Sequence, residues 1–340
     1  MDAPKILLIR RDNIGDLVCT TPLIAALRAR YPAARIDLLG NSYNIDVVRH
    51  DPRLNNVYAY TKTKHEPGQS ALRLYWRRLQ LIRALRGVGY DWIVLCQGGY
   101  NKRLAKWARW LKGRHVVGLV EPGDASRGLT DAQPALVGAH HEVERLIPLL
   151  APLDARAEPP LQQIFADPAR ARASVERLRD GRPLVGVHIS ARRPKQRWPA
   201  EHFKALILAL HAQLGARVAL FWSPGAEDNP MHMGDDAKAA QVLAGLPADA
   251  VVACPTGTLA ELMADLSALD LYIGADGGAM HLAAGLGKPI VCLFGDSDTV
   301  RWRPWGVPAT VLQAPDQDVS SISVETVVEA AKALAAQTTQ

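Results

Sequence analysis

The sequence predicts an α/β protein made of two successive lobes, each a parallel β-sheet covered by helices. The chain has 340 residues, which suits two domains of about 150 residues each. Apolar runs of strand length alternate with helical stretches from end to end, the pattern of parallel strands joined by helices. Prolines gather between residues 148 and 183, where strands are scarce, and we place the connection between the lobes there.

The first lobe begins with a strand at residues 6–9. After a polar loop, Leu23, Ala26 and Leu27 follow a helical period that ends at Tyr31-Pro32. The other elements expected in this lobe are strands at 35–39, 57–60, 92–95 and 116–119, a short helix at 46–50 and a basic helix at 73–86.

The second lobe repeats the alternation. Its expected elements are strands at 184–189, 218–222, 271–273 and 290–294, and helices at 200–214, 259–269, 280–286 and 324–336. We expect two Rossmann-like lobes, residues 1–165 and 166–340, facing each other across a central cleft, with the last helix a candidate to pack back on the first lobe. Ligands bind at the carboxyl ends of the strands in such sheets.

The composition is that of a soluble globular protein, with 48% apolar and 22% charged residues. No apolar run approaches the roughly 20 residues of a membrane-spanning helix, and the N-terminal apolar run is too short for a signal peptide. We therefore expect a cytoplasmic protein. The four cysteines form no C-x-x-C pair, which favours buried free thiols.

The net charge of +6 is unevenly distributed. Lysines and arginines crowd the segment from Lys62 to Arg114, whose acidic residues are Glu66 and Asp91. One reading is a set of solvated helix faces, and the other is a surface for an anionic partner. A lipid surface or acidic glycolipid fits better than nucleic acid, because no nucleic-acid motif accompanies the tryptophans in this segment.

A glycine-rich helix start near the C-terminus is the first candidate site. The expected strand at 271–273 leads into Gly274, Asp276, Gly277 and Gly278, and a helix follows with His281 in its first turn. Glycines let the backbone approach a ligand closely, and the free N–H groups and dipole of a helix start attract an anion. This predicts a phosphate cradle. Asp276 as a helix cap and His281 as a core histidine are the alternatives.

The second candidate is Asp16, in the loop that follows the first strand. At the carboxyl end of that strand its carboxylate is placed to take a proton from an acceptor hydroxyl. An N-cap or turn aspartate is the alternative reading.

The third candidate is the cationic loop from Ser190 to Pro199. It carries Arg192, Arg193, Lys195 and Arg197 after the first strand of the second lobe. These cations are suited to neutralise a leaving diphosphate. A solvated basic loop is the alternative.

Several strings of the chain, spread in order from residue 5 to about 306, resemble one family, the ADP-heptose:lipopolysaccharide heptosyltransferases of glycosyltransferase family 9. The strings are Gly15-Asp16 with Thr21-Pro22, His141-Glu142-Val143, Trp198-Pro199, and Asp276 to Ala283 followed by Pro289 and Leu293-Phe294-Gly295.

The resemblance implies an inverting transferase of the GT-B fold. An ADP-sugar donor would be bound mainly by the second lobe, and the acceptor, the lipid A and core oligosaccharide at the cytoplasmic face of the inner membrane, by the first. Asp16 matches the general base of the family. Gly277, Gly278 and His281 match its diphosphate site, and Asp276 matches the acidic residue beside that site.

One position departs from the family pattern. A lysine is common two residues before the Trp-Pro pair, and this chain has Gln196 there, so the resemblance leaves the phosphate-neutralising role to Lys195 or Arg197. The acidic residue for the nucleotide ribose corresponds to Glu227 or Asp228.

The string Asp296-Ser297-Asp298 has the form of a D-x-D metal motif. The family's fold uses a helix dipole and cations in place of a metal, so we expect no metal and no cofactor besides the donor, with Asp298 lining the donor site. Three alternatives stay open: a transferase for another nucleotide sugar or acceptor, a nucleotide-sugar epimerase of similar architecture, and a non-catalytic nucleotide-sugar sensor. The lack of G-x-G-x-x-G after either first strand disfavours nicotinamide chemistry.

Overall fold

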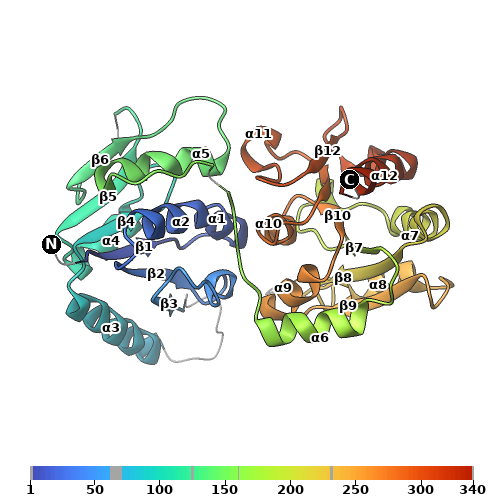
Figure 1. Ribbon diagram of the computed structural model, residues 1–340, viewed down its shortest axis with the longest axis horizontal. Coiled ribbons are helices and arrows are strands. Elements are labelled where there is room, and N and C mark those ends of the chain that lie inside the picture. The colour runs from blue at the N-terminus through green and yellow to red at the C-terminus, as the bar shows by residue number, and fades with distance from the viewer. Residues whose placement is uncertain (1–2, 62–70, 124–125, 160, 230–232, 339–340) are drawn as a thin grey trace. The chain divides into compact units, whose positions relative to one another are not determined.

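The structure is a computed structural model that describes residues 3–61, 71–123, 126–159, 161–229 and 233–338 (Figure 1). The chain divides into two compact units, Met1–Gln162 and Gln163–Gln340. Each unit contains one six-stranded sheet in which all neighbouring strands are parallel. The predicted α/β class with two parallel sheets is therefore confirmed. In the part of the chain described, no helix has the length and hydropathy needed to cross a membrane.

The sheet of the first unit has the strand order β3-β2-β1-β4-β5-β6. Its central strand β1 is fully buried from Ile6 to Ile9, as expected for a parallel strand covered by helices on both faces. The strands are β1 Lys5–Ile9, β2 Arg35–Asn41, β3 Asn56–Tyr60, β4 Trp92–Leu95, β5 His115–Val120 and β6 Asp131–Pro134. The helices are α1 Ile14–Val18, α2 Thr21–Arg30, α3 Ala71–Val88, α4 Lys102–Leu111 and α5 Glu142–Leu146, with short 3₁₀ helices at Ile45–Val48 and Ile147–Leu153.

The sheet of the second unit has the order β12-β11-β10-β7-β8-β9. The strands are β7 Leu184–His188, β8 Arg217–Trp222, β9 Val251–Pro255, β10 Leu271–Ala275, β11 Ile290–Phe294 and β12 Ala309–Gln313. The helices are α6 Pro168–Leu178, α7 Ala200–Leu214, α8 Asp236–Leu243, α9 Leu259–Ser267, α10 Gly278–Gly285, α11 Thr299–Trp302 and α12 Val324–Thr338, with 3₁₀ turns at Pro194–Gln196 and Val319–Ser321. The last helix, α12, packs on α7 and on strands β10, β11 and β12 of its own unit.

The two sheets share one topology. In each, the first strand of the unit lies in the middle, the next two strands extend to one side, and the last three extend to the other. The strand order thus reverses between β1 and β4 in the first unit and between β7 and β10 in the second. Loops at the carboxyl ends of such a pair of strands are the usual position of a ligand site in open parallel sheets.

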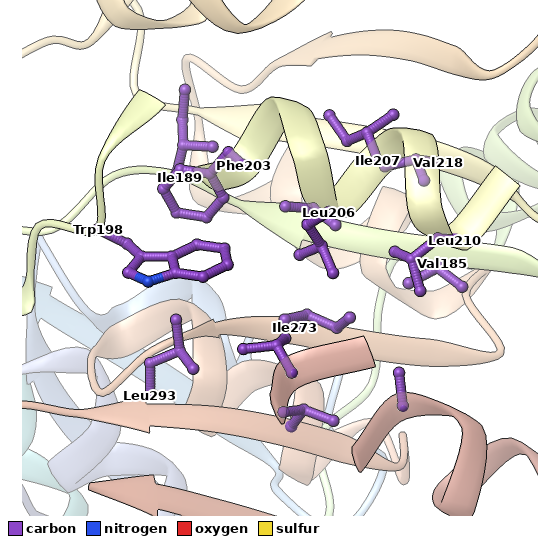
Figure 2. Close-up of a cluster of buried hydrophobic side chains, with 14 of the residues drawn as sticks. Val185, Ile189, Trp198, Phe203, Leu206, Ile207, Leu210, Val218, Ile273 and Leu293 are labelled. Atoms are coloured by element: carbon purple, nitrogen blue, oxygen red, sulfur yellow. The ribbon is translucent and has the colours of Figure 1, made fainter. Parts of the chain in front are cut away.

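The predicted Trp-Pro pair anchors the loop that follows β7. Trp198 is 1% exposed and packs edge-on against Phe203, with 5.0 Å between the ring centroids, in the core that also contains Ile189 and Leu293 (Figure 2). Its indole N–H donates to the carbonyl of Ile322 at 2.9 Å, which satisfies the ring's one polar atom. The core therefore fixes the end of the cationic loop.

Candidate active site

The glycine-rich segment forms the start of α10 at the carboxyl end of β10. Gly277 is the N-cap residue, and the backbone N–H of Asp276 just before it donates to the carbonyl of Leu293 at 3.1 Å. Gly277 is exposed, and a Cβ at this position would meet no atom within 4 Å. The first N–H groups of a helix have no partner inside the helix, so this open helix start presents donors and a positive dipole end to an anion.

The loop after β7 reaches this helix start. The side-chain amide of Gln196 is 7% exposed and donates to Asp276 Oδ2 at 3.2 Å and to Ser297 Oγ at 3.0 Å. The backbones also approach closely, since a Cβ on Gly295 would lie 2.4 Å from the carbonyl oxygen of Lys195. Only glycine fits at position 295 without displacing the loop. The ends of β7, β10 and β11 therefore meet in one place, and a neutral amide holds Asp276 there.

The two cations predicted to face the diphosphate have different surroundings. Arg197 donates to Asp235 Oδ1 at 2.8 Å and lies 2.8 Å from Glu227 Oε1, so two carboxylates neutralise its guanidinium. Lys195 is exposed in the 3₁₀ turn of the loop, and Asp228 is also exposed. Glu227, predicted for the ribose, thus forms an ion pair with Arg197 in this structure.

A further cation near this loop was not singled out in the sequence. Lys238 in α8 donates to the carbonyl of Ile189 at 3.2 Å and lies over the ring of Phe203. Burial lowers the pKa of Lys238 to about 8, although the nearby carboxylate of Asp235 opposes the shift. No charge pattern around residue 238 in the sequence points to this location beside the end of β7.

His281 lies inside the unit. It is 4% exposed in α10, and its ring meets Trp302 of α11 edge-on with 6.0 Å between centroids. This packing agrees with the core-histidine reading, while contact with a diphosphate stays a prediction.

The apparent D-x-D motif has a local structural explanation. Asp298 is the N-cap of α11, and its Oδ1 accepts from the N–H groups of Val300 at 2.9 Å and Arg301 at 3.2 Å. Asp296 forms an exposed ion pair with Arg193 at 3.5 Å. Within the described ranges no three His, Cys, Asp or Glu side chains form a group able to hold a metal.

In the first unit, a buried charge network lies at the carboxyl ends of β1 and β4, the two strands between which the strand order reverses. Arg10 follows β1 and is 1% exposed. Its Nη1 donates to the carbonyl of Cys96 after β4 at 2.6 Å, and its Nη2 donates to Asp16 Oδ1 and, at 2.9 Å, to Glu142 Oε1. One guanidinium therefore joins the ends of the two strands between which the order reverses, and it sets the position of the Asp16 carboxylate.

Asp16 also caps its own helix. It is the third residue of α1, and its Oδ2 accepts from the backbone N–H and the side-chain amide of Asn13, both at 3.0 Å. The capping reading of Asp16 therefore describes one of its roles in the structure. Burial favours the neutral acid, but Arg10 and the Asn13 hydrogen bonds outweigh it and hold the pKa of Asp16 below its ordinary value. The carboxylate is ionised at neutral pH, and its side chain is 11% exposed.

Sequence reasoning did not assign a role to Arg10 or Glu142. Glu142 is 1% exposed and comes 132 residues after Arg10 in the chain, so no local spacing links the two. The signal that was present is an arginine directly after a strand of four apolar residues, where a buried cation requires a buried anion.

The family model and the curated relatives agree on one family. The family model described as glycosyltransferase family 9 (heptosyltransferase) matches residues 78–331. Lipopolysaccharide heptosyltransferase 3 of Escherichia coli is 28% identical over 302 residues, covering 86% of this chain and 83% of that protein. Lipopolysaccharide heptosyltransferase 2 of Salmonella typhimurium is 26% identical over 324 residues, covering 91% of this chain and 88% of that protein.

Solved structures share the fold over the whole length. A glycosyl transferase family 9 protein of Veillonella parvula superposes with a TM-score of 0.81 at 21% identity, and 99% of each chain is covered. The ADP-heptose lps heptosyltransferase II of E. coli superposes with a TM-score of 0.77 at 23% identity, covering 99% of this chain and all of that one. An E. coli heptosyltransferase solved with ADP gives 0.78 at 19% identity, covering 97% of this chain and 99% of that one.

Proposed function

The chain belongs to glycosyltransferase family 9, and from this premise we propose that it transfers a heptose from ADP-heptose to the inner core of lipopolysaccharide. The family resemblance read from the sequence motifs is thereby confirmed. The transfer we propose inverts the anomeric carbon and needs no metal or cofactor.

One observation carries the proposal. Each sheet holds a group of the required chemistry at the point where its strand order reverses: an ionised Asp16 in the first unit and an open glycine helix start in the second. A base for an acceptor hydroxyl and an anion site for a leaving diphosphate are the two functions that sugar transfer from a nucleotide diphosphate requires. The names of the relatives, lipopolysaccharide heptosyltransferases, suggest the donor and acceptor.

On the donor side, we assign the diphosphate to the helix start at Gly277 and Gly278, with Asp276 and His281 as its neighbours. Lys195 is the better of the two predicted cations, because Asp235 and Glu227 already neutralise Arg197. Glu227 and Asp228 remain the candidates for the nucleotide ribose. A donor hydroxyl that bound Glu227 would compete with Arg197 for its carboxylate.

On the acceptor side, Asp16 takes the proton of the attacking hydroxyl as the bond to the anomeric carbon forms. The bond to the diphosphate breaks at the same time, and ADP leaves with its charge at the α10 start. General-base assistance of this kind contributes about 10² to 10⁴ in rate. Because Arg10 and Asn13 lower the pKa of Asp16, the carboxylate is a weak base toward a neutral alcohol. Proton transfer is therefore expected late, when bond formation has made the hydroxyl acidic.

The acceptor we propose is a lipid-linked, acidic oligosaccharide. The basic segment identified in the sequence supports this, although Lys62, Lys64 and Glu66 lie outside the described residues. We accordingly place the protein in the cytoplasm, in peripheral contact with the inner membrane, and assign it no nucleic-acid partner.

Mass spectrometry of the products tests the proposal. The purified protein is incubated with ADP-heptose, with other nucleotide sugars, and with or without a core acceptor truncated before its heptoses. We expect a mass increase of one heptose on the acceptor with ADP-heptose. An altered free sugar made without acceptor would indicate the epimerase, and donor binding without turnover on any acceptor would indicate the sensor.

The matched variant Asp16→Asn keeps the side-chain size and removes the base. It should lose turnover by about 10² or more while ADP affinity stays within a few-fold of the wild type. Turnover near that of the wild type would refute the base assignment.

A further inference from the structure

Helix α3 carries an apolar stripe that faces away from the protein. Leu72, Tyr75 and Trp76 are 65%, 57% and 56% exposed. Their spacing of three and four residues places them on one side of the first two helical turns. Three large apolar side chains exposed together form a patch, and such a patch on a folded protein marks an interaction surface.

The stripe is separate from the face by which α3 joins the fold. Leu74 and Leu85 are buried, and Leu81, Ile82 and Val88 pack against the core formed with α4. These residues form the apolar inner face that an amphipathic helix normally packs against a core. The outward apolar stripe is additional and makes no contribution to that core.

The helix that carries the stripe and its neighbour α4 are both basic, and neither contains an acidic residue. The sequence of α3 contains five arginines and no aspartate or glutamate, and α4, which packs beside it, contains four cations and again no acid. On α4, the ammonium group of Lys106 lies over the ring of Trp110, so this helix also combines an aromatic side chain with a cation. The exposed basic residues are Arg73, Arg77, Arg83 and Arg86 on α3 and Lys102, Arg103, Lys106 and Arg109 on α4.

We propose that this face of α3 docks on an anionic phospholipid bilayer, with Leu72, Tyr75 and Trp76 inserted at the boundary between headgroups and acyl chains. Tryptophan and tyrosine favour this boundary, and arginines at the rim of the stripe bind lipid phosphates. The inference rests on the proposed function in that a lipid-linked acceptor brings the enzyme to a membrane. The inference adds that helix α3 is the part of the protein that contacts the membrane.

Vesicle sedimentation of the full-length protein tests the docking. The vesicles are phosphatidylethanolamine with and without phosphatidylglycerol, and neither donor nor acceptor is present. We expect binding only with phosphatidylglycerol. The triple variant Leu72→Ser, Tyr75→Ser, Trp76→Ser should bind about tenfold less or weaker still. The matched control, Val137→Ser with Leu161→Ser, changes apolar residues that are 78% and 50% exposed elsewhere and should bind like the wild type.

The charge contribution is measured separately. Replacing Arg73, Arg83 and Arg86 by glutamine should weaken binding by about fivefold per charge at low salt, and added salt should reduce the difference. Arg170→Gln with Arg172→Gln, which removes exposed cations of the second unit, should leave binding unchanged. Equal vesicle binding by the wild type and the triple serine variant would overturn the proposal.

Kinetics separate this inference from the proposed function. On a deacylated, water-soluble acceptor the triple serine variant should keep the kcat/KM of the wild type, and on the acylated form of that acceptor, embedded in anionic vesicles, it should lose about tenfold. A wild type that binds vesicles but transfers no heptose in either format would remove the proposed function and leave the docking inference standing. A variant that loses activity equally in both formats would refute the docking role.

Discussion

Replacing Arg10 by methionine should destabilise the first unit severely. Methionine approximates the volume of the arginine stem but leaves Asp16 and Glu142, with side chains 11% and 1% exposed, close together without their shared cation. Removing one partner of a buried ion pair costs about 3–5 kcal/mol. For a unit of this size that corresponds to a fall in melting temperature of about 6–20 °C.

Hydrogen exchange measured by mass spectrometry is the suitable assay, because it reports on each unit by itself. Peptides from β1 and β4 should lose about 3–5 kcal/mol of protection in Arg10→Met, while peptides from β7 and β10 keep theirs. The control is Arg49→Met, which breaks an ion pair with Asp46 whose side chains are 55% and 34% exposed. That change should cost about 0–1 kcal/mol.

A rescue variant distinguishes unpaired charge from lost packing. Adding Asp16→Asn and Glu142→Gln to Arg10→Met removes both uncompensated carboxylates and should recover most of the lost free energy of unfolding. If Arg10→Met cost less than about 1 kcal/mol, or if the triple variant were no more stable than the single one, the network would not have the energetic role argued above.

Three further predictions concern the remaining site residues. The pKa of Asp16 is lower in the fold than in the unfolded chain, so Asp16 stabilises the protein above its unfolded pKa and this contribution is lost as the pH falls through the native pKa. The difference in unfolding free energy between wild type and Asp16→Asn, followed by urea denaturation, should be largest above about pH 4 and shrink in stronger acid; a constant difference would contradict the pKa direction. Trp198→Ala should cost about 3–5 kcal/mol in exchange protection of β7 and α7, and a loss below about 1 kcal/mol would show that the loop is anchored elsewhere. Gly277→Val should leave the melting temperature nearly unchanged, because the backbone there is extended and the space around a Cβ is open, yet ADP affinity measured by calorimetry should fall by about tenfold or more; unchanged affinity would exclude the α10 start as the phosphate site.

The buried strands were predictable because their side chains alone identify them. Residues 6–9, 92–95, 218–222 and 290–294 are apolar runs, and the structure places each in an inner strand. Of the edge strands, β3 was predicted at residues 57–60, and β6, β9 and β12 were not predicted. Asp131–Pro134 has the sequence DAQP and is half-exposed, so its strand conformation comes from pairing with β5 and not from its own residues.

The proline-rich segment between residues 148 and 183 contains a helix that was not predicted from the sequence. Pro168 is the first residue of α6, where its missing N–H costs nothing, and Asp167 caps that helix by accepting from the N–H of Arg170 at 2.9 Å. From the sequence we placed the connection between the lobes in this segment and predicted no helix there, although one of the prolines begins a helix. α6 packs on α9, and this contact is invisible in a polar sequence.

The sequence was enough to identify candidate residues that directly follow strands. It was not enough to identify side chains that pair across a long sequence separation. Asp16 and Gly277 follow strands, so the topology alone directed attention to them. Glu142, which binds Arg10, and Asp235, which binds Arg197, come from distant segments, and only the folded chain shows that Arg197 is paired while Lys195 is exposed. In the sequence, Lys195 and Arg197 were equivalent candidates for neutralising the diphosphate.

The two networks that position the candidate groups have no residue in common. Arg10, Asp16 and Glu142 belong to the first unit, and Gln196 and Asp276 to the second. Substitutions that retune one network therefore leave the hydrogen bonds of the other intact. If the second unit binds the donor and the first unit the acceptor, as we propose, the chain can acquire a different sugar donor while keeping its acceptor chemistry, and a hybrid joined at residue 162 with another family member would inherit each property from a separate parent.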